Sequence, residues 1–147
     1  MIGVRMADTK DIPFIAMVEG ETFSDPWSEE AIASHFASPF AISIVVEEGD
    51  RPLGYLLGSL LAPESELYRI AVLRDARRGG LGRAILDFFL DEMRRRGAES
   101  VYLEVRESNR AARELYLSAG FTEIGIRKNY YRRPDENAAI LVKGLLC

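Results

Sequence analysis

The sequence is poor in the side chains from which covalent and metal sites are built. Its 147 residues include one cysteine, Cys147, and one histidine, His35. A single cysteine cannot close an internal disulfide or supply a cysteine-rich zinc site, and a single histidine leaves no His-rich metal cluster. The pattern of a Ser-His-Asp or Cys-His nucleophile system is also missing. We therefore expect no bound metal. We also expect that the Cys147 thiol has no functional role and that His35 is a polar residue on a helix.

Long apolar runs are absent as well. No stretch approaches the roughly 18 apolar residues that a membrane-spanning helix needs. The first residues lack the basic and then apolar pattern of a signal peptide, because Asp8 and Asp11 come early. The sequence predicts a chain with no membrane contact, and a cytoplasmic location is the default expectation.

Length and composition are those of one ordinary globular domain. A chain of 147 residues matches the roughly 150 residues of a typical domain, and 48% hydrophobic with 29% charged residues is an average balance. No internal repeat, low-complexity tract or flexible linker divides the chain. We expect a single domain over residues 1–147.

Charge is distributed unevenly along the chain. Residues 1–66 carry 12 acidic and 3 basic side chains, whereas residues 67–147 carry 11 acidic and 16 basic. The most basic stretch contains five arginines and one acid, Asp75; the arginines are Arg69, Arg74, Arg77, Arg78 and Arg83. Such a stretch suits a phosphate-bearing ligand, either a nucleic acid or a phosphorylated cofactor.

Hydrophobic periodicity predicts a mixed α/β (α+β) fold with a largely antiparallel sheet flanked by helices. Expected strands are 2–6, 40–48, 52–62, 67–73, 100–106, 121–131 and 138–146, the second and third forming a hairpin at Gly49-Asp50. Expected helices follow Asp8, run from Ser28 to about residue 37, span 81–96, and run from Asn109 to near Gly120. Within 100–106, Val101, Leu103 and Val105 alternate with Tyr102, Glu104 and Arg106.

A glycine-rich segment joins the predicted strand 67–73 to the helix that follows it. In Arg77-Arg78-Gly79-Gly80-Leu81-Gly82-Arg83, backbone N–H groups and a helix N-terminus could cradle a pyrophosphate. The segment is not a Walker A loop, because no Gly-Lys-Ser/Thr follows, and Ile85 replaces the third glycine of the dinucleotide fingerprint. A glycine-rich turn with solvated arginines is the alternative interpretation.

Several blocks resemble a known family. Arg77-x-x-Gly80-x-Gly82 after Ile70-Ala71-Val72 is similar to the acetyl-CoA loop of the GNAT N-acetyltransferases. Further blocks resemble the bacterial RimI branch of that family: Pro26-Trp27-Ser28-Glu29, Leu103-Glu104-Val105-Arg106-x-Ser108-Asn109, Leu115-Tyr116-x-x-x-Gly120-Phe121 and Arg127-x-Asn129-Tyr130-Tyr131. The resemblance spans nearly the whole chain. It implies a single GNAT domain that transfers an acetyl group from acetyl-CoA to the N-terminal alanine of a small-subunit ribosomal protein, S-eighteen.

The same resemblance implies two catalytic residues. An α-amine with a pKa of about 8 needs only a modest base before it attacks, and the departing CoA thiolate needs a proton. Glu104 matches the family's base and Tyr116 its acid, so direct transfer needs no covalent acyl-enzyme. From the residues alone, Glu104 could equally be a surface partner of Arg106, and Tyr116 a core aromatic beside Phe121.

Cofactor and acceptor residues are implied in the same way. Ile70, Ala71 and Val72 would offer backbone groups to pantetheine, and residues Arg78, Gly79, Gly80, Leu81, Gly82 and Arg83 would hold the pyrophosphate. Arg77 would reach the ribose phosphate or stay solvated, as would Arg74, and Asn109 would contact the CoA arm while also capping a helix. Trp27, Tyr130, Tyr131 and Glu136 would surround the acceptor peptide.

The acceptor residues leave alternatives open. Trp27 could instead be a hydrophobic staple before the Ser28 cap, and the two tyrosines could be ordinary strand residues. The acidic first half favours a basic peptide N-terminus, such as a ribosomal tail. Family members usually have Glu-Asp-Ala where this chain has Glu136-Asn137-Ala138, which leaves the choice of substrate open.

Two other functions compete with peptide acetylation. A GNAT enzyme for a small amine, such as a polyamine or an aminoglycoside, would share the cofactor loop and differ in its acceptor pocket. An RNA- or ribosome-binding module would use the arginines of 69–83, but aromatic residues for base stacking are sparse there. We therefore expect no nucleic acid partner, and a monomer is the simplest assembly.

Overall fold

The computed structural model describes residues 1–146, so the expectation for Cys147 lies outside the described residues. These residues form a seven-stranded sheet in the order β1-β2-β3-β4-β5-β7-β6, in which β4 and β5 are parallel and the other neighbours antiparallel. The strands are β1 (Ile2–Met6), β2 (Ala41–Glu48), β3 (Arg51–Leu61), β4 (Glu64–Val72), β5 (Ser100–Arg106), β6 (Thr122–Tyr131) and β7 (Glu136–Gly144). The predicted α/β fold with a largely antiparallel sheet is confirmed.

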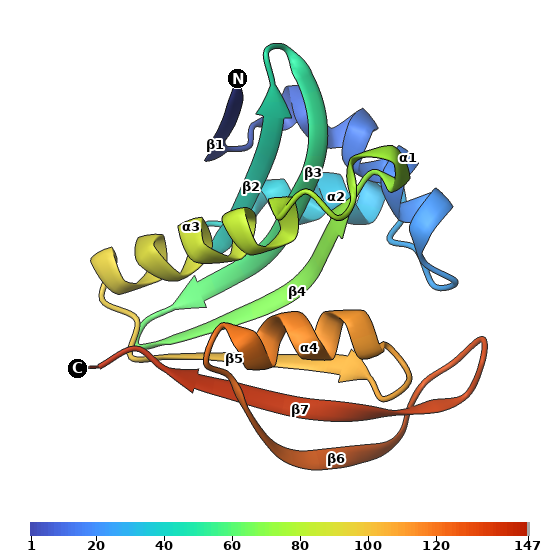
Figure 1. Ribbon diagram of the computed structural model, residues 1–147, viewed down its shortest axis with the longest axis vertical. Helices are drawn as coiled ribbons and strands as arrows, with labels where there is room; N and C mark the ends of the chain where they lie inside the picture. The colour runs from blue at the N-terminus through green and yellow to red at the C-terminus, as the bar shows by residue number, and fades with distance from the viewer. Residues whose placement is uncertain (147) are drawn as a thin grey trace.

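Helices cover both faces of this sheet (Figure 1). They are α1 (Ile12–Thr22), α2 (Glu29–Ala37), α3 (Leu81–Arg95) and α4 (Arg110–Ser118), with short 3-10 turns at Thr9–Asp11 and Arg74–Ala76. Two predicted caps are present: the Ser28 hydroxyl accepts from Ala31 N–H, and the Asn109 side chain accepts from Ala112 N–H. Pro13 lies in the first turn of α1, where its missing N–H costs no helical hydrogen bond.

Two hydrophobic cores hold the layers together. The larger core packs Ile85, Phe89 and Met93 of α3 against the sheet, and the inward residues of β5 join it as the alternation predicted. The smaller core packs α1 and α2 against the other face through Ile15 and Ile32. Each such buried side chain contributes about 1.5–3 kcal/mol to folding, which fixes the helices on the sheet.

Strand β4 differs from its prediction. It begins at Glu64 rather than residue 67, because Glu64 through Leu67 pair with Ser100 through Leu103 of β5. Pairing of the backbone extends the strand through polar residues that give no apolar signal. Strand β7 likewise begins at Glu136, two residues earlier than expected.

The parallel pair β4 and β5 opens into a split. The two strands pair over four residues and then diverge, as Figure 1 shows. The cause lies in a β-bulge: the register against β3 shifts between Leu57 and Gly58, so Tyr68 has no residue opposite it. A Cβ at Gly58 would come within 2.5 Å of the Glu66 carbonyl, so the close approach here requires glycine. The split positions the candidate site.

Candidate active site

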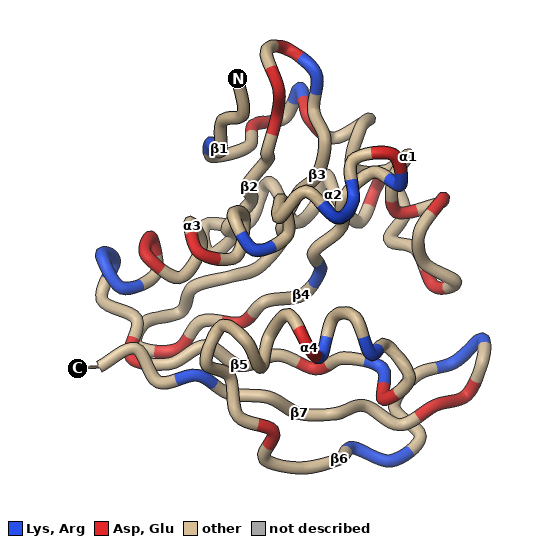
Figure 2. The backbone as a smooth tube through the Cα atoms, viewed as in Figure 1, with Lys and Arg blue, Asp and Glu red and all other residues tan. Residues whose placement is uncertain are grey.

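The glycine-rich segment forms an open helix N-terminus. Arg78 (φ +69°) and Gly80 (φ +77°) adopt left-handed conformations, and Gly80 precedes α3 without any side-chain cap. The first N–H groups of a helix have no intrahelical acceptor, and the helix dipole adds positive potential there. Lys and Arg gather between the end of β4 and the start of α3 (Figure 2). The segment therefore has the geometry of an anion site.

The arginines near this segment have separate partners. Arg77 Nε donates to the Val72 carbonyl at 3.0 Å, and Arg83 Nε donates to Asp87 at 2.9 Å. The sequence grouped Arg69 with the basic stretch suited to a phosphate ligand, and the structure corrects this, because Arg69 lies away from the glycine-rich segment. It is 13% exposed, pairs with Asp25 and Glu19, and stacks on the Phe23 ring. Strand alternation turns Arg69 toward α1, so the basic stretch is not one surface.

The predicted cofactor residues lie at one end of the split. Ile70, Ala71 and Val72 pair with β3 on one side, while their other side faces the opening left by β5. Asn109 follows the carboxyl end of β5, and parallel strands end at the same edge of a sheet. A Cβ at Gly82 would lie 3.6 Å from Leu115, so the start of α3 also approaches α4. The split, the glycine segment and α4 thus meet at one edge.

Glu104 projects from β5 on the face of α1 and α2. Its side chain is 10% exposed, and its Oε2 atom lies 3.2 Å from Arg127 Nε in an ion pair. That oxygen accepts no hydrogen bond from any described residue. Pairing with Arg106, the alternative left open by the sequence, does not occur in residues 1–146. Glu104 is therefore a largely buried carboxylate whose charge is met by Arg127.

Tyr116 lies on α4 and is 4% exposed. Its ring packs against Phe121 with centroids 5.7 Å apart, so the core position considered from the sequence is real. Burial, and secondly the neighbouring Tyr131, hold the pKa of Tyr116 well above its usual range. The hydroxyl stays protonated at neutral pH, so core packing and proton donation are compatible at this residue.

A pocket of about 410 Å³ lies beside Glu104 on the α1 and α2 face. The pocket is lined by Asp25, Trp27, Glu66, Leu67, Tyr68, Arg69, Glu104, Tyr130 and Tyr131. It brings three of the four predicted acceptor residues together with Glu104, and we call it the acceptor pocket. Glu136 is not among its lining residues. Its carboxylate accepts from Ser108 N–H at 2.6 Å and from Arg106 at 3.3 Å, and Ser108 foremost lowers its pKa.

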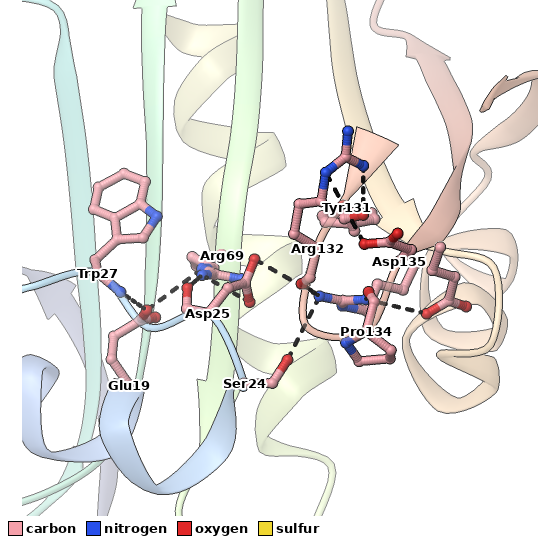
Figure 3. Close-up of polar contacts among 11 residues, drawn as sticks. Glu19, Ser24, Asp25, Trp27, Arg69, Tyr131, Arg132, Pro134 and Asp135 are labelled. Atoms are coloured by element: carbon pink, nitrogen blue, oxygen red, sulfur yellow. Dashed lines mark hydrogen bonds and ion pairs between the residues drawn. The ribbon is translucent and has the colours of Figure 1, made fainter. Parts of the chain in front are cut away.

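Two chain segments wall the acceptor pocket, and Arg106 joins them. Its guanidinium donates to the carbonyls of Arg132 and Pro134, at 2.7 and 2.9 Å, in the turn between β6 and β7. It also reaches the Ser24 hydroxyl at 3.5 Å, between α1 and α2, and stacks 4.6 Å from the Tyr131 ring centre. Figure 3 shows these contacts, which we call the Arg106 clasp.

A buried carboxylate anchors the wall between α1 and α2. Glu19 is fully buried; it accepts from Trp27 N–H at 2.9 Å and from the Tyr55 hydroxyl at 2.6 Å. Arg69 Nε lies 3.4 Å from Glu19, and Arg69 also donates to the Asp25 carbonyl at 2.6 Å (Figure 3). The hydrogen bond from its backbone N–H to Glu19 thus fixes the position of Trp27 independently of the contacts that its ring makes.

Sequence reasoning missed several residues of this site, among them Glu19, Asp25, Glu66, Tyr68 and Arg127, and it assigned Arg69 to the phosphate segment. A weak signal existed for some of them. Glu19 interrupts the apolar face of α1, and a buried charge there demands a partner. Arg127 stands in a motif to which no role had been given. Nothing local marks Glu66 or Tyr68, because strand pairing and the bulge bring them to the pocket.

Two kinds of feature were not found in the described residues: a cluster of metal-binding side chains and a helix able to cross a membrane. No group of three or more His, Cys, Asp or Glu side chains in residues 1–146 could hold a metal ion. Within the same residues, no helix combines the length and apolar character needed to cross a membrane.

A split sheet beside an open helix N-terminus, with a largely buried carboxylate in an adjoining pocket, suits a group transferase that uses a phosphate-bearing coenzyme. Comparison with known proteins agrees: the sequence model of the Acetyltransferase (GNAT) family matches residues 12–121. The chain belongs to the Acetyltransferase (GNAT) family and is an acetyl-CoA-dependent N-acetyltransferase, as its motifs predicted.

Individual relatives confirm the resemblance to the RimI branch. The chain is 37% identical over 140 residues to the ribosomal protein bS18-alanine N-acetyltransferase of Escherichia coli (strain K12), covering 94% of each chain. The crystal structure of the Escherichia coli ribosomal-protein-S18-alanine N-acetyltransferase superposes with a TM-score of 0.93 at 34% identity, covering 100% of this chain and 96% of the other. The structure of Ard1 from Thermoplasma volcanium follows with a TM-score of 0.89 at 26% identity, covering 99% of each.

Proposed function

We propose that this enzyme acetylates the α-amine of an N-terminal alanine on the small-subunit ribosomal protein bS18. The observation that carries the proposal is the acceptor pocket, in which Glu104 lies with Trp27, Tyr130 and Tyr131. Support comes from the relatives, which carry that activity in their names at 37% identity over nearly the full length of both chains. The cytoplasmic location and the monomer remain predictions of the sequence.

The proposed chemistry assigns each residue one task. Bound acetyl-CoA supplies the acetyl thioester, and the open N–H groups before α3 fit its pyrophosphate. Glu104, which lines the acceptor pocket, accepts a proton from the acceptor ammonium, which leaves the amine nucleophilic. Tyr116 gives its proton to the departing thiolate, since its raised pKa keeps the hydroxyl protonated until then.

The departure from the family pattern at Asn137 is compatible with this acceptor. Its side-chain oxygen accepts from Asn129 N–H at 2.9 Å and so supports the left-handed Asn129 (φ +53°) beside Tyr130. An aspartate at this position would accept the same hydrogen bond. The substitution is therefore compatible with the conformation of the last part of β6, which carries the two tyrosines.

The test is a competition among acceptors. Purified enzyme with acetyl-CoA is given a peptide with the N-terminal sequence of bS18, the same peptide with other first residues, and free polyamines, and products are read by mass spectrometry. We expect acetylation of the alanine α-amine above all others. Modification of polyamines alone would overturn the peptide acceptor and retain the N-acetyltransferase activity.

A further inference from the structure

A second pocket of about 690 Å³ adjoins the acceptor pocket. The two share Glu66 and Tyr68 as lining residues, so they meet along β4. The second pocket extends over the face of β4 and β5 toward the start of β2, where Phe40 lines it. No role in acetyl transfer accounts for this space.

The lining of the second pocket is negative. It includes the carboxylates of Glu64 and Glu66 and contains neither lysine nor arginine. Glu66 is half-buried and makes no hydrogen bond or ion pair with any described residue. A carboxylate removed from water in this way lacks the positive partner that would offset its burial.

The junction of the two pockets also has too little positive charge. Glu66 lies near Glu104, whose side chain is nine-tenths buried and whose Oε2 accepts no hydrogen bond from a described residue. Arg127 opposes both carboxylates and is half-exposed. Burial, and secondly the charge of Glu104, raise the pKa of Glu66. A cationic guest would relieve this repulsion.

Aromatic rings complete the second pocket. Phe40, Tyr68 and Tyr102 line it, and the faces of such rings attract cations. The Tyr68 hydroxyl is fixed by donation to Ser59 Oγ at 2.9 Å, which orients its ring. Burial lowers the pKa of His35 at the rim, so this histidine is neutral at physiological pH and does not repel a cation.

We propose that the second pocket binds the cationic side chain of the second residue of the acceptor peptide, with Glu66 as its counter-charge. The inference rests on the proposed function and deepens it by naming a substrate preference. Consecutive residues of an extended peptide lie 3.8 Å apart, so a first residue in the acceptor pocket places the next side chain within reach of the adjoining one.

The test compares arginine with citrulline, its neutral isostere, at the second position of an N-terminal alanine peptide. In the wild-type enzyme we expect kcat/KM to be about tenfold higher for arginine, the size of a charge-assisted contact. In Glu66→Gln the two peptides should react at equal rates, because the arginine peptide slows to the rate of the citrulline peptide.

Two controls make the outcome specific. Glu48→Gln removes an exposed carboxylate at the far end of β2 and should keep the preference. A peptide pair with arginine or citrulline at position four should show no preference, which separates a pocket from general attraction. Equal rates for the wild type at position two, or a preference retained by Glu66→Gln, would overturn the subsite alone. Failure to acetylate any alanine peptide would instead overturn the proposed function.

Discussion

The fold determines the position of Glu104, the proposed base. The carboxylate stands on an otherwise regular strand, and the β5 alternation places it opposite the core residues Leu103 and Val105. Arg127 Nε lies 3.2 Å from Oε2 in an ion pair that offsets the charge of the largely buried carboxylate. The motif was enough to identify Glu104 from the sequence. Its ion-pair partner was not predictable, because Arg106 is its neighbour along the strand whereas Arg127 comes from another strand.

Replacing Glu104 tests the base directly. Glu104→Gln keeps the shape and removes the proton acceptor, so we expect kcat to fall by about 10²–10⁴ while acetyl-CoA affinity changes less than about twofold. Glu123→Gln is the matched control, because it breaks the comparable Glu123–Arg113 pair outside the acceptor pocket. Initial rates and calorimetric titration with acetyl-CoA measure both quantities. Equal losses of kcat in the two variants would reject the assignment.

Tyr116, the proposed acid, has its own expected pH dependence. Burial keeps the pKa of Tyr116 above its usual range, so the hydroxyl remains protonated, and able to donate, as the pH rises through neutrality. Tyr116→Phe should lower kcat by about 10²-fold or more, and the wild-type to variant ratio should stay constant between about pH 7 and 9. A ratio that collapses toward one within this range would mean that Tyr116 titrates there and does not act as proposed.

At the scale of elements, the sequence predicted the helices that hydrophobic periodicity and capping residues determine locally. The 3.6-residue repeat of Ile85, Phe89 and Met93 gave α3, and the caps at Ser28 and Asn109 gave the starts of α2 and α4. The bulge at Tyr68 and the split beyond Leu67 could not be predicted from the residues around them, because both depend on pairing with the distant strands β3 and β5. The acceptor pocket follows from that split, so its lining was only partly foreseen.

The Arg106 clasp links two elements that the sequence separates widely. Arg106 lies in β5, while its partners Ser24 and Pro134 lie in the α1–α2 loop and the β6–β7 turn, next to segments that line the acceptor pocket. A planar guanidinium can bind several carbonyls at once, whereas a lysine ammonium offers one point charge. The clasp should therefore matter for holding the acceptor and matter less for the chemical step.

Arg106→Lys tests the clasp through a split between KM and kcat. We expect the peptide KM to rise about tenfold, with kcat within about threefold and the acetyl-CoA KM unchanged, because loosened walls weaken acceptor binding. Arg113→Lys is the matched control: Arg113 also bridges a backbone carbonyl and a carboxylate, but outside the pocket. An equal rise of both substrates' KM values would indicate a general structural role instead.

At the scale of the whole molecule, the two proposed substrate sites lie on different parts of the surface. The acceptor pocket opens on the face of α1 and α2, while the glycine segment lies at the edge where β4 meets α3. The charge asymmetry seen along the chain has this spatial meaning, since the negative pockets belong largely to residues 25–68 and the open helix N-terminus follows residue 77. The uneven distribution of charge was visible in the sequence, but only the fold shows that the acidic pockets and the glycine segment lie on separate surfaces.

If the glycine segment holds the pyrophosphate, acetyl-CoA should stabilise the entire fold. Ligand at about 100 times its dissociation constant adds about 2.7 kcal/mol to the free energy of unfolding. For a chain of this size that corresponds to a rise in Tm of about 5–10 °C in a thermal shift measurement. S-acetylpantetheine, which lacks the pyrophosphate, should raise Tm far less at the same concentration.

Comparing alanine variants of Gly80 and Gly49 tests whether the stabilisation by acetyl-CoA depends on the glycine segment. Gly80 and Gly49 both have left-handed φ angles, +77° and +61°, and a Cβ at either would meet nothing within 4 Å, so alanine costs each site about 1 kcal/mol of backbone strain. Both variants should therefore lose similar Tm without ligand. Only Gly80→Ala should also lose much of the acetyl-CoA shift, because it distorts the N–H groups that face the pyrophosphate, whereas Gly49 lies in the distant β2–β3 turn. An undiminished shift in Gly80→Ala would place the phosphate contacts elsewhere.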